Sequence, residues 1–337
     1  MLDSFHRFRL LSGPTPIERL TRLEQNLGDE LGGARLFVKR DDLMSVGGGG
    51  NKLRKLEFLV GAALADGCDT FITTGGLQSN HARLSAAACA RAGLSCEVVL
   101  TRAVPRDDVE YRRNGNVLLD NLFGATVHEL PGDVDAIEFA HERAGELRTL
   151  GRNAYVVGSG GSSPIGALGY VACALEIVEQ EAEFGPFSDV VLPNGSSGTH
   201  AGLAAGFAAL RRDSLRLESF AVWADAASTH ARTYDIACET LTMIDRAADL
   251  DRTRIFIDGQ ELGEGYGRPT EAMFQAVRLV AKTEGLILDP VYGGKAFAGL
   301  LAAVRRGAYD AGSSVLFVMT GGLPGVFAYR PAFDDGD

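Results

Sequence analysis

Short β-rich runs alternate with helical patterns along this 337-residue chain, and this alternation most limits the folds it can adopt. Amphipathic, alanine-rich stretches such as 81–93 and 199–212 separate the runs and are typical of helices. Strands that alternate with helices usually form parallel sheets whose faces the helices cover. We therefore expect an α/β protein with strands over 34–40, 69–74, 96–100, 125–130, 154–159, 189–194, 219–224 and 314–320.

The charge and the apolar pattern exclude two classes of partner. The net charge is −11, and no run of basic residues is present to neutralise a nucleic-acid backbone, so we expect no nucleic-acid partner. No stretch approaches the apolar length that spans a bilayer, and the N-terminus lacks the pattern of a cleaved leader. We expect a cytoplasmic protein without a membrane partner.

The cysteines favour neither a metal site nor disulfides. They show no C-x-x-C pair and no histidine at metal-ligand spacing, so we expect no metal and reduced thiols. The residues concerned are Cys68, Cys89, Cys96, Cys173 and Cys238.

Four expected strands end in glycine-rich turns that open a helix. The turns lie in 73–84, 156–170, 191–203 and 318–327. In open α/β sheets, ligands bind beyond the carboxyl ends of the strands, so these turns are the first places to look for a site.

Lys52 is the strongest candidate nucleophile. Only five of the 33 basic residues are lysines, which shortens the search for an amine that condenses with a carbonyl. Lys52 follows Asn51 and four glycines (47–50) and precedes an amphipathic helix. The glycines let the backbone approach a planar ligand closely, while the helix start fixes the amine. The alternative is a solvated lysine in a first helical turn.

Three common motifs are missing. The glycine run lacks the G-x-x-x-x-G-K-[ST] order of a phosphate-binding loop in nucleotide hydrolases. G-x-G-x-x-G and G-x-S-x-G are also absent, so dinucleotide binding and serine hydrolysis have no motif support.

The turn NGSSGTHAG (194–202) has the features of a phosphate site. Small residues leave backbone N–H groups free to converge at a helix start, and hydroxyls add further donors. A plain Gly-Ser connector is the alternative, and we expect His200 to be a structural helix residue. The predicted phosphate ligands are Gly195, Ser196, Ser197, Gly198 and Thr199.

The turn in 73–84 presents Gln78, Ser79, Asn80 and His81 in succession at another helix start. These groups and their amides are suited to hold an α-carboxylate and a ring hydroxyl of a ligand. An ordinary helix cap formed by Ser79 or Asn80 is the alternative.

Tyr266 and Tyr292 lie in glycine-rich, polar contexts, GEGYG and DPVYGG. A phenol in a closed site can exchange a proton with a leaving group or orient a carboxylate, although most tyrosines are packing residues. Thr320 ends a strand before a glycine turn, where its hydroxyl could bond a ring nitrogen or merely end the strand.

Taken in order, the motifs resemble the D-cysteine desulfhydrase and 1-aminocyclopropane-1-carboxylate (ACC) deaminase family of pyridoxal 5'-phosphate (PLP) enzymes, which includes L-cysteate sulfo-lyase. The resemblance runs from about Pro14 to Tyr329. The motifs are KRDD (39–42), GGNKLRKLEF (49–58), QSNHAR (78–83), GNVLLD (115–120), GALGY (166–170), GSSGTHAG (195–202), GEGYG (263–267), DPVYGGKA (289–296) and TGG (320–322).

The resemblance implies a fold-type II PLP enzyme, similar to the tryptophan synthase β subunit. Two open twisted sheets would be covered by helices, with a small domain inserted in a larger one and the cofactor in the cleft. The expected PLP-binding domain is 1–55 and 166–337, and the expected small domain is 56–165. The family also implies a homodimer.

The same resemblance assigns residue roles. Lys52 would hold PLP covalently and act as the general base, with Asn51 beside the cofactor. Ser79, Asn80 and His81 match the residues that contact the substrate carboxylate and the cofactor. Ser79 is also expected to take part in catalysis. Gln78 is expected to contact the substrate together with them. The remaining matches are Gly195 to Thr199 for the phosphate, Tyr266 and Tyr292 for the catalytic tyrosines and Thr320 for the pyridine nitrogen.

Two departures bear on the substrate. ACC deaminases resemble DPVYEGK at the second tyrosine, whereas this chain has Gly293 in place of the glutamate. Without that acid the cofactor is a weaker electron sink, which suits loss of a good leaving group better than opening of a cyclopropane ring. Gly47 and Gly48 also stand where relatives often have bulkier residues, which affects the shape of the loop.

We therefore expect β-elimination from D-cysteine to pyruvate, ammonia and hydrogen sulfide. SGTHAG and LRKLEF look like the desulfhydrase, whereas HAR after QSN and GEGYG look like L-cysteate sulfo-lyase, which releases sulfite. ACC deaminase is a further alternative. From another class, an amino-acid racemase or a PLP-binding protein without lyase activity stays open.

Overall fold

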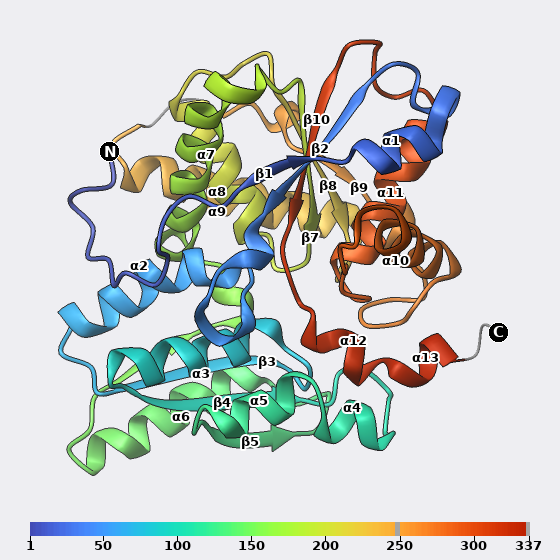
Figure 1. Cartoon of the computed structure of the whole chain (residues 1–337). Helices are drawn as coiled ribbons and strands as arrows, with labels where there is room; N and C mark the ends of the chain where they lie inside the picture. The colour runs from blue at the N-terminus through green and yellow to red at the C-terminus, as the bar shows by residue number, and fades with distance from the viewer. Residues whose placement is uncertain (247–249, 335–337) are drawn as a thin grey trace.

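Six strands form the larger of two sheets in the computed structural model, which describes residues 1–246 and 250–334. All neighbours pair in parallel except β1 and β2, which are antiparallel. The strand order is β1 (Ile17–Arg19), β2 (Arg35–Arg40), β10 (Ser314–Met319), β7 (Asp189–Asn194), β8 (Arg216–Ala221) and β9 (Phe256–Asp258) (Figure 1).

Four parallel strands form the smaller sheet, below the larger one in Figure 1. Their order is β5 (Thr126–Leu130), β4 (Ser95–Thr101), β3 (Thr70–Gly76) and β6 (Ala154–Val157).

Alternating apolar residues attach helices to both faces of the smaller sheet. Phe71 packs in the cluster that includes Leu84 of α3, whereas Ile72 packs with Ala140 and Leu147 of α6. Because successive strand residues point to opposite faces, α3 and α6 cover opposite sides of the sheet. The helices here are α3 (Asn80–Ala92), α4 (Val109–Arg113), α5 (Asn116–Leu122) and α6 (Ala136–Thr149).

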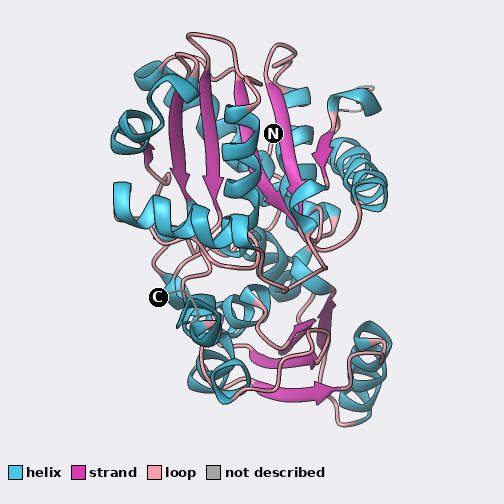
Figure 2. Ribbon diagram, turned by 90° about the vertical axis from the view of Figure 1, so that its right-hand side faces the viewer, coloured by secondary structure: helices cyan, strands magenta, loops and turns pink. Residues whose placement is uncertain are grey.

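The larger sheet is sandwiched in the same way (Figure 2). Val38 and Phe317 pack in one apolar cluster with residues of α1, α10 and α11, and Phe37 and Leu316 pack in another with α7, α8 and α9. These helices are α1 (Thr21–Leu27), α7 (Pro164–Phe184), α8 (Gly198–Ala209), α9 (Ala226–Met243), α10 (Glu271–Glu284) and α11 (Gly293–Arg305).

Two segments connect the sheets. Helix α2 (Lys52–Ala65) packs against both α7 and α3, so its first turn lies where the two halves meet (Figure 1). Near the C-terminus, α12 (Pro324–Ala328) packs against α4 and α5, and α13 (Arg330–Asp334) follows it. The chain thus returns from the larger sheet to helices of the smaller one.

The predicted α/β class with two helix-covered sheets is confirmed. All eight expected strands are present, although β8 begins at Arg216, three residues before the expected 219. The short edge strands β1 and β9 were not predicted. The four strands of the smaller sheet lie between residues 70 and 157, but the domain boundaries stay a prediction. Within the described residues, no helix is both long and apolar enough to cross a membrane.

Candidate active site

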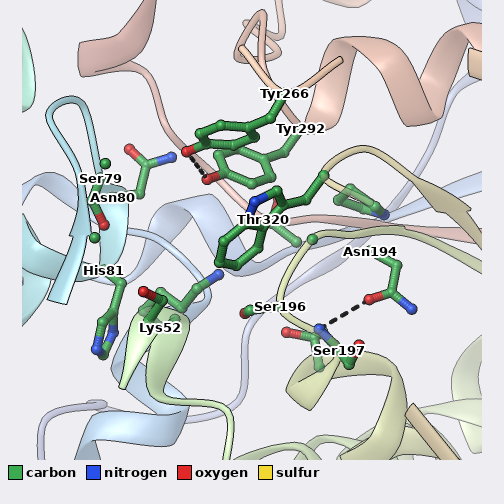
Figure 3. A pocket seen from close by; sticks show the side chains of 18 of the residues that line it. Lys52, Ser79, Asn80, His81, Asn194, Ser196, Ser197, Tyr266, Tyr292 and Thr320 are labelled. Atoms are coloured by element: carbon green, nitrogen blue, oxygen red, sulfur yellow. Dashed lines mark hydrogen bonds between the residues drawn. The ribbon is translucent and has the colours of Figure 1, made fainter. Parts of the chain in front are cut away.

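A cavity lies between the two sheets, at the carboxyl ends of their strands, and all four glycine-rich turns contribute to it. Figure 3 shows how its principal side chains face a common space. The lining residues are Asn51, Lys52, Gly75, Gly76, Ser79, Asn80, His81, Thr101, Ala103, Ala136, Ser159, Gly160, Pro193, Asn194, Gly195, Ser196, Ser197, Thr199, Trp223, Tyr266, Tyr292 and Thr320.

The glycine loop before Lys52 needs glycine for steric reasons. All four residues from 47 to 50 have positive φ, and a Cβ on Gly49 would lie 2.1 Å from the carbonyl oxygen of Asp42. The loop ends in a bond from the backbone N–H of Asn51 to the carbonyl oxygen of Thr320, 3.0 Å long. Lys52 therefore begins α2 from a tightly constrained position.

The amine of Lys52 has a neutral bonding partner. Its Nζ donates to Oδ1 of Asn51 at 3.0 Å and lies 6.0 Å from the centre of the Tyr292 ring. Burial lowers the pKa of Lys52 to about 8, the charge of Asp289 opposes this change, and Arg83 lowers the pKa further. A substantial fraction of the amine is therefore unprotonated, and nucleophilic, near neutral pH.

The serine turn is fixed by side-chain bonds at the start of α8. Ser197 adopts φ of +74°, and its backbone N–H donates to Oδ1 of Asn194 at 3.1 Å (Figure 3). Nδ2 of Asn51 donates to Oγ1 of Thr199 at 3.1 Å, which ties the turn to the lysine loop. Ser196, Ser197 and Thr199 line the cavity, whereas Gly198 lies just behind it.

A second buried lysine supports this turn, and sequence reasoning missed it. Nζ of Lys55 donates to the carbonyl oxygen of Gly160 at 3.0 Å and to Oγ of Ser162 at 3.1 Å. Ser162 in turn donates to Oγ of Ser196 at 2.8 Å. Lys55 is three residues after Lys52, so the helical period places both on one side of α2, and that spacing could have identified it.

The two candidate tyrosines contact each other at the cavity. Their hydroxyl oxygens are 2.6 Å apart, and the rings of Tyr266 and Tyr292 lie edge to face (Figure 3). Burial raises the pKa of both phenols, that of Tyr292 well above its ordinary value. The pair therefore keeps its protons at neutral pH and can donate them. The ring of Trp223 lies 5.7 Å from that of Tyr266.

Asp289 fixes Tyr292, a role that the sequence analysis did not assign. Its carboxylate accepts bonds of 2.7–3.0 Å from the backbone N–H groups of Val291, Tyr292 and Gly293 at the start of α11. Burial raises the pKa of Asp289 to about 6, while these three bonds oppose the change. An aspartate four residues before the first residue of the helix was the available signal.

The turn after β3 is only partly directed to the cavity. Ser79 and Asn80 line it, and Oγ of Ser79 also caps α3 by accepting from the backbone N–H of Ala82 at 3.2 Å. His81 lines the edge, but its Nε2 bonds the hydroxyl of Thr73 at 2.9 Å, and burial lowers its pKa so that it is neutral.

The structure does not bring Gln78 to the cavity. The amide nitrogen of Gln78 donates to the carbonyl oxygens of Tyr111 and Asn114, and its oxygen accepts from the backbone N–H of Asn116. Both ends of the side chain are therefore engaged in holding α4 and α5. His200 is buried, as a structural helix residue would be, with Nδ1 bonded to Ser219 at 2.7 Å and a pKa lowered to about 3 by burial.

Comparison with known families decides what kind of site this is. The model of the family described as "Pyridoxal-phosphate dependent enzyme" matches residues 8–321. The chain belongs to the pyridoxal-phosphate-dependent enzyme family.

Curated relatives of this PLP enzyme are similar over its whole length. The D-cysteine desulfhydrases of Salmonella choleraesuis (strain SC-B67) and Salmonella typhi are each 40% identical over 330 residues, which cover 98% of both chains. A crystal structure of an ACC deaminase homologue superposes with a TM-score of 0.87 at 35% identity, covering 99% of this chain and 97% of that one. A PLP-dependent aspartate racemase shares the fold, with a TM-score of 0.66 at 15% identity.

The residues of the cavity fit PLP. Among the described lining residues there is no aspartate or glutamate, so the wall offers one amine together with hydroxyl, amide and backbone donors. Such a donor set suits an anionic ligand, and the hydroxyl-rich start of α8 suits its phosphate. Gly198 has no room for a side chain, since a Cβ would lie 2.7 Å from Oγ of Ser162.

Proposed function

We propose that this PLP enzyme is a lyase that converts D-cysteine and water to pyruvate, ammonia and hydrogen sulfide. The desulfhydrases at 40% identity over 98% of the chain support this substrate. The observation that carries the proposal is the placement of the Lys52 amine, which has no bonded carboxylate, beside a bonded pair of protonated tyrosines.

The amine of Lys52 acts in two ways. It would hold PLP in the resting enzyme, and once free it would remove the proton from the substrate α-carbon. A pKa of about 8 leaves a sufficient unprotonated fraction for this step. When bound, PLP supplies an electron sink for the charge left on that carbon.

Ser79 and Asn80 bind the substrate carboxylate on the other side of the cavity. Both line it at the start of α3, where backbone N–H groups and the positive end of the helix favour an anion. Oδ1 of Asn80 accepts from Nδ2 of Asn116 at 2.9 Å, so the Asn80 amide is oriented with its N–H groups free to donate.

The tyrosine pair serves as the acid. The ring centre of Tyr292 lies 6.0 Å from the Lys52 amine, and its phenol is held by Asp289 through the backbone and by Tyr266 through the hydroxyl bond. It donates a proton to the sulfur as the carbon–sulfur bond breaks. The sulfur leaves as hydrogen sulfide, and water then converts the remaining three-carbon enamine to pyruvate and ammonia.

Thr320 and Gly293 together favour a good leaving group. Thr320 lines the cavity and is proposed to bond the pyridine nitrogen, because Gly293 supplies no acid there. A hydroxyl protonates that nitrogen less readily than a carboxyl group does, which suits loss of a thiol better than opening of a carbon ring.

The remaining predictions about this protein are part of the same proposal. Asn51 and the residues from Gly195 to Thr199 contact the cofactor and its phosphate. The larger domain comprises 1–55 and 166–337, and the smaller one 56–165. The enzyme works as a cytoplasmic homodimer.

A substrate panel tests the function. The PLP-loaded enzyme is incubated separately with D-cysteine, L-cysteate, β-chloro-D-alanine and ACC, and pyruvate, sulfide, sulfite and 2-oxobutyrate are measured. We expect pyruvate and sulfide in equal amounts from D-cysteine. Sulfite from L-cysteate, with no product from D-cysteine, would make the enzyme a sulfo-lyase instead. L-cysteine formed from D-cysteine without pyruvate would make it a racemase.

A further inference from the structure

A buried arginine and a buried carboxyl group have no part in the reaction proposed above. Arg83 lies on α3, Asp120 lies on α5, and neither side chain is exposed to solvent. Both belong to motifs of the sequence, QSNHAR and GNVLLD, for which the cavity provides no direct role at these two positions.

The guanidinium of Arg83 lies against the glycine loop that carries Lys52. Its Nη2 donates to the carbonyl oxygen of Gly49 at 2.9 Å. A Cβ on Gly48 would lie 3.4 Å from Nη1, and one on Gly50 would lie 3.5 Å from Nη2. The guanidinium thus bonds to Gly49 and lies beside Gly48 and Gly50, where a Cβ would be in ordinary van der Waals contact with it.

Asp120, on α5, lies close enough to Arg83 for an electrostatic interaction but is not bonded to it. Neither carboxylate oxygen of Asp120 has a hydrogen-bond partner among the described residues, and neither do Nε and Nη1 of Arg83. Burial raises the pKa of Asp120 to about 8, and Arg83 opposes this change. Burial lowers the pKa of Arg83 to about 10, so its charge persists at neutral pH, whereas Asp120, with a pKa of about 8, is mostly protonated there.

Helix α5 holds the second loop of the site as well. Its first residue, Asn116, donates its backbone N–H to Oε1 of Gln78 and its Nδ2 to Oδ1 of Asn80, both at 2.9 Å. One turn later Asp120 faces Arg83. The same short helix therefore fixes the carboxylate side of the cavity directly, and its Asp120 lies beside the arginine that bonds the lysine loop.

We propose that Arg83 is a positioning residue, which holds the glycine loop of Lys52 by its bond to Gly49 and keeps a positive charge near the amine. The inference rests on the proposed role of Lys52. It gives Arg83 a geometric effect on catalysis and an electrostatic effect on the Lys52 nitrogen.

The electrostatic effect can be separated from the other charges near Lys52. Asp289 raises the pKa of the amine, and Arg83 lowers it. Lys55 is a further amine near Lys52, and the charge of Lys52 lowers the pKa of Lys55. His81 is neutral. Because Asp289, Lys55 and His81 stay in place, removing the charge of Arg83 must make the Lys52 nitrogen easier to protonate.

Two substitutions in the PLP-loaded enzyme test the two effects. Arg83→Gln removes the charge, and Arg83→Lys keeps the charge but replaces the guanidinium by a shorter single amine that loses the directed bond to Gly49. Arg91→Gln is the matched control, since Arg91 is exposed near the end of the same helix. The pH midpoint of the visible cofactor absorbance is measured without substrate, and kcat and KM are measured with D-cysteine.

We expect Arg83→Gln to raise the absorbance midpoint and to lower kcat about tenfold with little change in KM, because a displaced loop misplaces the amine. Arg83→Lys should keep the wild-type midpoint and still lose kcat, and Arg91→Gln should match the wild type in both. An unchanged absorbance midpoint in folded Arg83→Gln would overturn the inference, and so would full kcat in Arg83→Lys. If Arg83→Gln does not fold, the kcat of Arg83→Lys decides the test. The absorbance titration needs no turnover. If the wild type does not turn over D-cysteine, that result contradicts the proposed function but not the inference about Arg83.

Discussion

Two residues at the start of α2 hold their positive charges in opposite ways. Arg54 is buried and bonds to two carboxylates, with Nη2 2.8 Å from Oδ1 of Asp41 and Nη1 2.9 Å from Oε2 of Glu176. Among the described residues, Lys52, two residues earlier, bonds only to the neutral amide of Asn51 at 3.0 Å. Lys39 also bonds to Glu176, so the charges on the Arg54 side are paired in a network.

The pKa values of the two residues follow from this difference. Burial alone lowers the pKa of Arg54, but Asp41 and Glu176 raise it well above its ordinary value. Burial lowers the pKa of Lys52 to about 8, and no bonded carboxylate cancels that effect. One side of the helix therefore uses charge to fix the fold, and the other leaves an amine reactive.

The largest effect is expected from Lys52→Ala. Turnover should fall at least about a thousandfold, because both the covalent link to PLP and the general base are lost. The visible absorbance of the lysine-bound cofactor should disappear, whereas the stability of the cofactor-free protein should not fall. Lys282→Ala, at an exposed position, is the control. Retained absorbance in Lys52→Ala would contradict the assignment.

Arg54→Met should have the reverse effect. It leaves Asp41 and Glu176 without their main partner, which typically lowers the free energy of unfolding by about 3–5 kcal/mol. Turnover per bound cofactor should change little, because Arg54 does not line the cavity. Urea unfolding and kcat measure the two quantities. The exposed pair of Arg305 and Glu30 provides the control, since Arg305→Met should cost under about 1 kcal/mol. Equal losses of unfolding free energy in Arg54→Met and Arg305→Met would contradict the proposed difference between the two sides of α2.

Tyr292→Phe should lower kcat roughly a hundredfold, since loss of a general acid commonly has an effect of this size. Its KM should change less. Tyr309→Phe is a matched control, because the hydroxyl of Tyr309 is also buried but has no hydrogen-bond partner among the described residues. A wild-type kcat in the Tyr292 variant would show that another group is the acid.

The smallest effect concerns pH. A lysine pKa lowered from 10.5 to about 8 means that protonation of Lys52 is disfavoured in the folded protein, so the amine loses its proton as pH rises through 8. The rate at which cofactor-free protein captures added PLP should rise roughly fivefold between pH 7 and 8 and then level off. Appearance of visible absorbance measures this rate. A rate that keeps rising tenfold per pH unit up to pH 10 would indicate an ordinary lysine.

The sequence predicted the parts of this protein that depend on local pattern. Strand periodicity located the sheets, and the rule that ligands bind beyond parallel strand ends brought four glycine-rich turns to one cavity. The sequence indicated a glycine loop that lets the backbone approach a planar ligand, and positive φ at each of its residues explains why glycine is needed there.

Contacts between segments distant in the sequence were not predictable in the same way. Gln78 looked like a substrate ligand, yet its partners are backbone groups near residues 111–116. Lys55 and Arg83 acquire their roles from the carbonyl groups of Gly160 and Gly49, which only the folded chain brings near. The strands β1 and β9 have three residues each, too few for a periodic pattern.

The most direct measurement of the central claim is the identification of the lysine that carries PLP. The loaded enzyme is reduced with borohydride, digested and analysed by mass spectrometry for the added pyridoxyl group. The account predicts the label on Lys52, in the peptide after the glycine loop. A label on Lys55, Lys295 or another lysine, with Lys52 unmodified, would contradict it.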